Sequence, residues 1–497
     1  MNRIATLLIV FFAFLNAYAT ATDPYDIKFT VDGMKNAKAI IAYRYGNNQY
    51  VKDTIESDAM GNFEFKGKDT MRNGVYLAVF PSLSNNYFEF IVTENDRNFS
   101  LHTASSNLNL SMKVVGSLEN KLFYDDLFFL NGKRAAADKI KKDLEDAKAK
   151  GEQKLQDKLS DDLKAIDTEV KAYRSDLMKN NPQTFYAKLL RAMQDVEVPD
   201  EVKNSTDPYA TYHFFRKHYW DNIDFTEDGL LRTPVYHEKL SSFISKAVPQ
   251  DPDSLIPACD EVLSKASVNN EMFKYSLVYL LNEYAKTKVM CMDRVYVHLV
   301  DAYYAKGRTW WNDETQLIKI KKRADELRPT LCGNIAPDLI LPDTSLKAYY
   351  QLSKTNAEYT VIAIWDPDCG HCKKEIPELK RVVDSLIDEK VSIQVYSVTT
   401  STYEEINKWK NFINENKLKW INVGDPYFQG KPNFRELYDV QSTPVLLVLD
   451  KDKKVIAKRI SPAQVAEIIR VYEKRKKDKL NGKPVTNEDK KGKTKTP

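Results

Sequence analysis

The stretch WDPDCGHCKKEIP, Trp365 to Pro377, decides the fold of the region that surrounds it. It holds two cysteines, Cys369 and Cys372, separated by a glycine and a histidine. The apolar run Tyr359 to Trp365 precedes them, and apolar residues at helical spacing follow from Cys372 to Asp388. We therefore expect a buried strand, a tight turn and a helix, with the two cysteines at the turn.

A cysteine pair at this spacing suits four kinds of site: a c-type haem anchor, a zinc site, a structural disulfide and a redox dithiol. Haem attachment needs a histidine directly after the second cysteine, where the sequence has Lys373. A structural zinc site needs four ligands, and the sequence holds no second CxxC motif. A disulfide that closes a two-residue loop constrains little of the unfolded chain. The pattern therefore favours a redox dithiol.

The predicted position of the dithiol gives it a physical cause of reactivity. The free N–H groups and the dipole at a helix N-terminus stabilise a thiolate, and such placement lowers a cysteine pKa from about 8.5. Cys372 would lie about one helical turn beyond Cys369, close enough for a disulfide. His371 adds a titratable cation beside the thiolate, which should lower the pKa of Cys369 further and make the disulfide more oxidising. We expect all three residues to be catalytic.

The residues from 331 to about 472 alternate between strand-like and helix-like runs. Strands are expected at Val391–Val398, Thr443–Leu449 and Val455–Ile460, and helices at Tyr403–Asn416 and Pro462–Lys474. This alternation predicts an α/β domain with a central mixed sheet.

These motifs together resemble the thioredoxin fold, and more closely the TlpA/ResA-like branch of exported thiol–disulfide oxidoreductases. The resemblance covers Leu331 to Tyr472 and rests on an ordered set of motifs: Trp365, the CxxC at 369–372, Pro377, Thr443-Pro444 before a strand, and GNIAPDLILPD at 333–343. The last motif is also similar to the opening of peroxiredoxins. A peroxiredoxin, however, has Thr or Ser three residues before its reactive cysteine, where this chain has Asp366.

The resemblance implies a role for each motif residue. Cys369 would be the attacking nucleophile, and Cys372 would resolve the mixed disulfide. Pro444 would be a cis-proline that faces the dithiol, and Thr443 would offer its backbone to the substrate chain. With Trp365, these two residues make up the expected substrate-binding set.

Two departures from the thioredoxin pattern leave the direction of exchange open. The buried acid of thioredoxin falls at Ala363 here, so Glu375 or water must take over any proton transfer. Glu375 is similar to a glutamate that aids proton transfer in the reductase branch. The dipeptide Gly370-His371 is that of disulfide isomerases, whose potential is about −180 mV against about −270 mV for thioredoxin.

The upstream regions differ from this domain in composition. Residues 22–115 hold short alternating apolar runs separated by turn residues, which predicts a β-sandwich. Residues 116–330 have helical spacing and charged faces, which predicts an all-α domain with a long polar hairpin near 130–175. Both more weakly resemble uncharacterised domains that precede such modules in Bacteroidetes proteins.

The other three cysteines leave the pairing open. Five cysteines are an odd number, so at least one thiol stays free in an oxidising compartment. Cys259 and Cys291 both fall in the helical region and could be bonded to each other. Cys332, at the entrance of the last domain, is expected to be a buried thiol.

The N-terminus of the chain indicates export, and the distribution of charge argues against nucleic-acid binding. Residues 1–21 have a short basic start, an apolar run and small-x-small cleavage patterns, which predicts a signal peptide. The apolar run is shorter than the ~20 residues that a spanning helix needs. The net charge is only +4 and ten basic residues lie from Lys474 onward, which argues against nucleic-acid binding. Residues 473–497 are expected to be disordered.

We therefore expect a soluble exported enzyme of a Gram-negative periplasm or envelope. It would exchange disulfides with protein substrates and use a separate redox partner, without a cofactor, a metal, nucleic acid or a stable membrane span. The alternative is an envelope binding or scaffold protein, in which the β and helical domains recognise a partner and the redox module is accessory.

Overall fold

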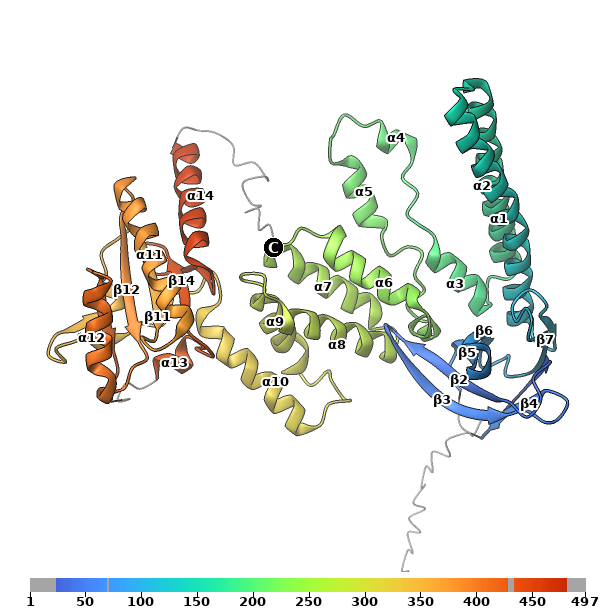
Figure 1. The fold of residues 1–497 in the computed structure, drawn as a ribbon, viewed down its shortest axis with the longest axis horizontal. Coiled ribbons are helices and arrows are strands. Elements are labelled where there is room, and N and C mark those ends of the chain that lie inside the picture. The colour runs from blue at the N-terminus through green and yellow to red at the C-terminus, as the bar shows by residue number, and fades with distance from the viewer. Residues whose placement is uncertain (1–23, 69–70, 428–432, 481–497) are drawn as a thin grey trace, which may run out of the picture. The chain divides into compact units, whose positions relative to one another are not determined.

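The computed structural model describes residues 24–68, 71–427 and 433–480 (Figure 1). The predicted signal peptide lies outside these residues. The chain divides into two compact units: Met1–Ala247 with Lys265–Tyr275, and Val248–Ser264 with Ser276–Pro497. The fold class is confirmed: an N-terminal all-β sandwich, a central all-α region and a C-terminal α/β thioredoxin fold.

The first unit begins with a β-sandwich of two four-stranded sheets, with strand orders β4-β1-β7-β8 and β3-β2-β5-β6. The strands are β1 (Tyr25–Asp32), β2 (Lys38–Tyr45), β3 (Asn48–Glu56), β4 (Asn62–Gly67), β5 (Gly74–Phe80), β6 (Asn86–Val92), β7 (Asn98–Ala104) and β8 (Lys113–Val115). Alternate residues of β1 are buried, because one face of its sheet covers the core. The core is rich in phenylalanine, with Phe29, Phe65 and Phe88 fully buried.

A long helical hairpin follows the sandwich, formed by α1 (Leu118–Lys150) and α2 (Gln153–Asn180), which lie side by side (Figure 1). Ser117 caps the start of α1 by accepting a hydrogen bond from the backbone N–H of Asn120. Gly151 ends α1 at a φ of 71°, a conformation that glycine adopts without strain. The predicted polar hairpin is confirmed.

Shorter helices complete the helical region of both units. They are α3 (Phe185–Met193), α4 (Asp200–Lys203), α5 (Ala210–His218), η2 (Asp228–Arg232), α6 (Pro234–Ser242), η3 (Phe243–Ala247), α7 (Pro252–Ala266), α8 (Asn270–Lys286), α9 (Asp293–Leu299), η4 (Val300–Tyr304), α10 (Glu314–Leu327) and η5 (Arg328–Thr330). No helix of the described residues is both long enough and apolar enough to span a bilayer.

The C-terminal domain is built on a five-stranded sheet of order β13-β12-β11-β14-β15. Its strands are β11 (Tyr359–Trp365), β12 (Ile393–Thr399), β13 (Ile421–Gly424), β14 (Val445–Leu449) and β15 (Val455–Lys458), preceded by the hairpin β9 (Ile340–Pro342) and β10 (Tyr349–Gln351). β11 pairs in parallel with β12 and antiparallel with β14, so the sheet is mixed as predicted. Every residue of β11 is buried, because side chains pack on both faces of the sheet.

Helices α11 (Gly370–Asp388), α12 (Ile406–Glu415) and α14 (Pro462–Leu480) pack on one face of this sheet. The short α13 (Phe434–Leu437) and the β9–β10 hairpin pack on the other face. Helix α14 continues to Leu480, so residues 473–480 of the tail expected to be disordered are helical, while 481–497 lie outside the described residues. Glu473 accepts a hydrogen bond from Tyr359 and Lys476 pairs with Glu358, so the helix end is tied to the start of β11.

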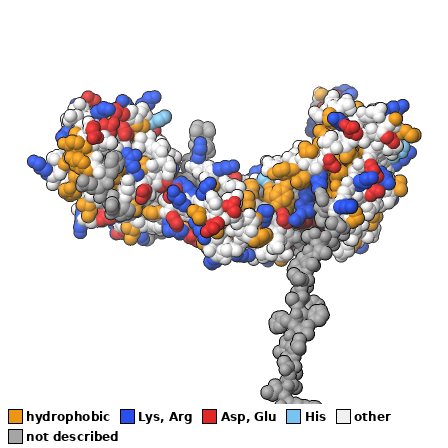
Figure 2. All heavy atoms as spheres, turned by 90° about the horizontal axis from the view of Figure 1, so that it is seen from below, with side chains coloured by type: hydrophobic (Ala, Val, Ile, Leu, Met, Phe, Trp, Pro, Cys, Tyr) orange, Lys and Arg blue, Asp and Glu red, His pale blue; other side chains and the backbone are white. Residues whose placement is uncertain are grey.

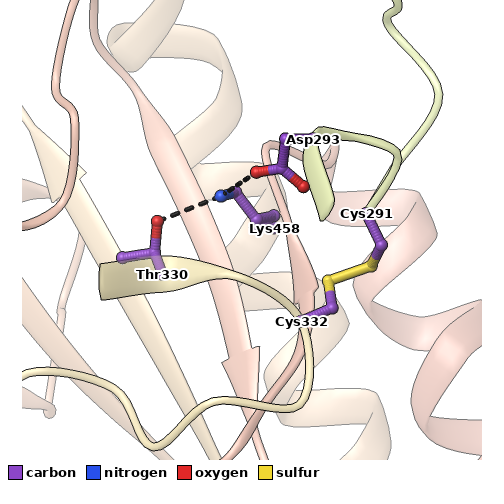
Figure 3. Close-up of a disulfide and its surroundings, with 5 residues drawn as sticks. All are labelled: Cys291, Asp293, Thr330, Cys332 and Lys458. Atoms are coloured by element: carbon purple, nitrogen blue, oxygen red, sulfur yellow. Dashed lines mark hydrogen bonds and ion pairs between the residues drawn. A yellow bond between two sulfur atoms is a disulfide. The ribbon is translucent and has the colours of Figure 1, made fainter. Parts of the chain in front are cut away.

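The expectation that Cys332 is a buried thiol was also wrong. Cys291 and Cys332 form a disulfide, with their Cα atoms 5.5 Å apart (Figure 3). Cys259, which could have bonded to Cys291, is a buried free thiol on α7. Beside the disulfide, the ammonium of Lys458 on β15 pairs with Asp293 and donates to the hydroxyl of Thr330, 3.0 Å away. The disulfide and the ion pair therefore attach the helices of the second unit to the thioredoxin-like sheet.

The described surface carries charges of both signs. Figure 2 shows Lys and Arg side chains interspersed with Asp and Glu on the face in view, without a continuous basic stripe.

Candidate functional site

The dithiol lies where the sequence predicted it, at the turn from β11 into α11. Cys369 is the N-cap of α11, and its sulfur accepts a hydrogen bond from the backbone N–H of Cys372 over 3.4 Å. Cys369 is partly exposed and Cys372 is fully buried, and neither is in a disulfide. Only the first sulfur is therefore open to an incoming substrate.

The surroundings give the two thiols opposite pKa shifts. Partial burial acts to raise the pKa of Cys369, but hydrogen bonds with Cys372, the Thr443 side chain and the backbone N–H of His371 outweigh it, and the pKa falls below its usual value. Burial raises the pKa of Cys372 to about 12. At neutral pH the exposed sulfur is the better nucleophile, while the buried one holds its proton.

The predicted cis-proline is present and lies beside the dithiol. The peptide bond between Thr443 and Pro444 is cis, directly before β14. The Cys369 thiol donates to the carbonyl oxygen of Thr443 over 3.3 Å. The structure thus brings Cys369, Thr443 and Pro444 together from segments that are far apart in the sequence.

Trp365 does not belong to the exposed part of the site. It is fully buried, its indole N–H donates to the hydroxyl of Ser397 over 2.6 Å, and its ring packs on Phe412. A side chain with no exposed surface cannot contact a substrate chain, so the expectation of substrate binding was wrong for this residue. β11 is covered on both faces, and the tryptophan fixes the strand end from which the dithiol turn starts.

The two other candidate residues differ in exposure. The side chain of His371 is exposed and that of Glu375 is half-buried, one helical turn beyond Cys372. Neither side chain has a hydrogen-bond or ion-pair partner among the described residues. Ala363 is fully buried, so the position of the thioredoxin acid is filled by a methyl group.

The sequence interpretation missed the loop that holds the dithiol turn. Asp366 accepts hydrogen bonds from the Thr400 hydroxyl over 2.7 Å and from the Asp368 N–H over 2.8 Å, and its carbonyl accepts from the Cys369 N–H. Lys408 of α12 pairs with Asp368. The sequence signal for this loop was Asp366 within Asp366-x-Asp368. An Asp side chain that accepts a hydrogen bond from the backbone N–H two residues on forms a turn.

The described residues contain no group of three or more His, Cys, Asp or Glu side chains arranged to hold a metal ion.

Three family models match the chain. Residues 332–458 match the AhpC/TSA family, residues 25–123 match a domain of unknown function, DUF4369, and residues 145–329 match another, DUF5106. A search of the curated proteins gave no match.

Several solved structures are similar. A thioredoxin-like protein from Bacteroides caccae is 23% identical, with 56% of this chain and 98% of that chain covered and a TM-score of 0.43. A domain of a "possible thiol-disulfide isomerase" from Cytophaga hutchinsonii is 38% identical, with 30% and 98% covered and a TM-score of 0.27. The thioredoxin domain of a thiol-disulfide oxidoreductase from Bacteroides vulgatus is 23% identical, with 28% and 96% covered and a TM-score of 0.25. All three TM-scores are below 0.5, so none of these similarities assigns a function by itself.

Proposed function

Since residues 332–458 form a thioredoxin-like domain that matches the AhpC/TSA family, we propose that the protein is an exported thiol–disulfide oxidoreductase. It exchanges disulfides with protein substrates through Cys369 and Cys372. The observation that carries this proposal is the asymmetry of the pair, in which Cys369 is exposed with a lowered pKa and Cys372 is buried with a raised one. A structural disulfide needs no such difference.

The asymmetry supports a two-step exchange. In the reducing direction, the Cys369 thiolate attacks one sulfur of the substrate disulfide, forms a mixed disulfide and releases the other sulfur as a thiolate. Cys372 then loses its proton to a base, and its sulfur attacks that of Cys369, which releases the second substrate thiolate. Two electrons pass to the substrate, and the protein keeps a Cys369–Cys372 disulfide. Oxidation of a substrate dithiol is the same sequence in reverse.

The high pKa of Cys372 makes its deprotonation the step that needs help. We propose Glu375 or water as the base, since Glu375 lies one turn away on α11 and Ala363 offers no acid. Thr443, whose carbonyl contacts the Cys369 thiol, would present its backbone to the substrate chain next to Pro444.

His371 and Glu375 favour opposite directions of exchange. The exposed imidazole favours the reduced pair and thus an oxidising disulfide, whereas the carboxyl group favours reduction of substrates. A potential of the pair near about −270 mV would mark a reductase, and one near about −180 mV or above an oxidase or isomerase. In either case a separate redox partner restores the pair.

Export to the envelope of a Gram-negative bacterium is part of the proposal. It rests on the signal-peptide pattern in residues 1–21 and on the Bacteroidetes sources of the similar structures.

The test is reduction of a disulfide-bonded protein such as insulin by the dithiothreitol-reduced protein. The wild type should reduce it faster than dithiothreitol alone, and Cys369→Ser should not. Lys374→Gln, on the exposed side of the same helix, is the matched control and should retain the rate. Equal rates for the wild type and Cys369→Ser would refute the proposal.

A further inference from the structure

A cavity of about 1010 Å³ lies within the first unit and is lined only by residues of that unit. It is bounded by the outer face of one sandwich sheet, the α1–α2 hairpin, α3 and the start of α6. This volume is at the upper end of the range of about 300–1,000 Å³ that is usual for small-molecule sites. The residues that line it lie in the two regions matched by domains of unknown function and in the helix between them.

The helical wall of the cavity is apolar. The stripes that face it come from successive turns of three helices: Leu127 and Leu130 of α1; Leu163, Ile166 and Val170 of α2; Leu189, Leu190 and Met193 of α3. The α1 and α2 members of this set are only partly buried, so their apolar surface is left uncovered by the protein. Covering such surface stabilises a complex in proportion to the apolar area removed from water, so a long apolar chain fits this wall.

The floor of the cavity is the outer face of the sheet and carries one charge of each sign. Leu77 pairs with Ala42 on one neighbouring strand and with Glu89 on the other, so these side chains share a face. Arg44, two residues beyond Ala42, is on the same face, and both Arg44 and Glu89 line the cavity. Burial raises the pKa of Glu89, and the nearby charge of Arg44 acts to lower it.

Arg232 adds a second cation beside the start of β5. It is 5% exposed and lines the cavity, and its Nη1 donates to the carbonyls of Asn73 over 3.1 Å and Asp228 over 3.4 Å. None of the described residues accepts a hydrogen bond from its Nε or Nη2. The nearest carboxylate, that of Asp228, is 3.9 Å away and also pairs with Arg72.

The other charges of the lining pair within the helices, where Asp138 alone faces two cations. Arg174 binds the carboxylate of Asp126 through two nitrogens, and Asp138 lies between Arg134 at 3.8 Å and Lys141 at 4.0 Å. Arg44 forms no ion pair among the described residues, although its charge acts on Glu89 across the same face. The lining contains six Lys and Arg side chains and four Asp and Glu side chains, so it carries an excess of positive charge.

A peptide strand is a poor fit for the same cavity, because the edge of the sheet beside it is already closed. β6 is the edge strand. The side chain of Asn120 accepts from the N–H and donates to the carbonyl of Ile91, each over 2.8 Å, and the Tyr124 hydroxyl donates to the carbonyl of Glu89 over 2.7 Å. These backbone groups are not free to pair with an added strand.

We propose that this cavity binds a single-chain amphipathic anion, with an acyl chain along the α1–α2–α3 wall and a carboxylate or phosphate head at Arg44 and Arg232. Guanidinium groups bind both heads through paired, charge-assisted hydrogen bonds. The site does not depend on thiol chemistry, so the proposal stands or falls separately from the function of Cys369 and Cys372.

Isothermal titration calorimetry on the full-length protein tests this with three probes below their micelle concentrations: dodecanoate, a lysophosphatidic acid with a twelve-carbon chain, and neutral dodecanol. Saturable binding of either anion supports the proposal, and the tighter of the two identifies the head group. Dodecanol should bind about tenfold more weakly, because it cannot make the charge-assisted bonds. No saturable binding of either anion, or dodecanol binding as tightly, would overturn it.

Two variants with matched controls locate the site. Arg44→Gln should weaken anion binding about tenfold while dodecanol binding is unchanged, and Lys28→Gln, exposed on β1 outside the cavity, should have no effect. Ile166→Asn should weaken all three probes, while Lys164→Gln, on the exposed side of α2, should not. Circular dichroism confirms folding. If both Arg44→Gln and Ile166→Asn fold and bind like the wild type, the assignment is wrong.

Discussion

Removal of the disulfide between Cys291 and Cys332 should destabilise the second unit by about 4 kcal/mol. The bond joins residues 41 positions apart. In the chain-entropy description, the loss of entropy in the unfolded chain is about 2.1 + 1.5R ln n cal/mol/K, which for this separation is about 13 cal/mol/K, or about 4 kcal/mol at 25 °C. Both cysteines are partly exposed, so Cys291→Ser with Cys332→Ser leaves no large buried cavity.

The assay is urea unfolding, monitored by hydrogen exchange in peptides from α9, α10 and β15. The disulfide and its neighbouring ion pair join these elements. With a slope of about 2–3 kcal/mol/M, the midpoint for these peptides should fall by about 1.3 to 2 M. Both proteins should also carry Cys369→Ser and Cys372→Ser, so that the disulfide between Cys291 and Cys332 is the one that a reductant acts on. The parent with dithiothreitol should then match the double-serine variant. A midpoint that moves by less than about 0.3 M would refute the reasoning.

Asp439→Asn should destabilise the same unit by about 3–5 kcal/mol, because the buried carboxylate pairs with Arg323 and Arg459, and its loss removes the one ion pair of Arg459 among the described residues and leaves Arg323 with Glu326. Burial acts to raise the pKa of Asp439, but the bonds to Arg323 and the charge of Arg459 outweigh it, so the pKa is lowered. The contribution of Asp439 to the free energy of unfolding should therefore be complete above the unfolded-state pKa of about 3.9 and be lost as the pH falls further. Urea unfolding at pH 7 and pH 3 measures the size of this contribution and its pH dependence. Equal differences between wild type and variant at the two pH values would contradict the expected pH dependence. In the reduced protein, iodoacetamide should modify Cys369 with a half-maximal rate at a pH below that of an ordinary thiol, while Cys372, with a pKa of about 12, should stay unmodified up to about pH 10; mass spectrometry of the labelled peptides measures this, and equal labelling of the two would contradict it.

The features that the sequence predicted correctly are those in which neighbouring residues act together. The continuous apolar run of β11 indicates a strand covered on both faces, and the break at Cys369 indicates the helix start. The cis bond beside the dithiol was expected from the resemblance to the thioredoxin fold, which Thr443-Pro444 before an apolar run helps to carry. In each case the signal lies within a few residues.

The features that the sequence could not predict depend on segments that meet only in the folded chain. Cys332 bonds to Cys291, which is 41 positions away in the sequence, because the turn after α8 and the entrance to β9 meet beside β15. Trp365 is hidden because Phe412 of α12 packs on it. No local sequence pattern shows that Cys332 lies near Cys291 or that Phe412 covers Trp365. The fold therefore corrected the roles expected for Cys332 and Trp365.

The proposed exchange requires Cys369 to be the sulfur that a substrate disulfide meets first. The test is to incubate Cys372→Ser and Cys369→Ser, each reduced, with an excess of a disulfide-bonded peptide and to locate the adduct by mass spectrometry. Cys372→Ser should accumulate the peptide on Cys369, because the exposed nucleophile is present and the resolving thiol is absent. Cys369→Ser should carry almost none, because its remaining sulfur is buried and protonated. An adduct on Cys372 at a comparable rate, or no adduct on Cys369, would contradict the account.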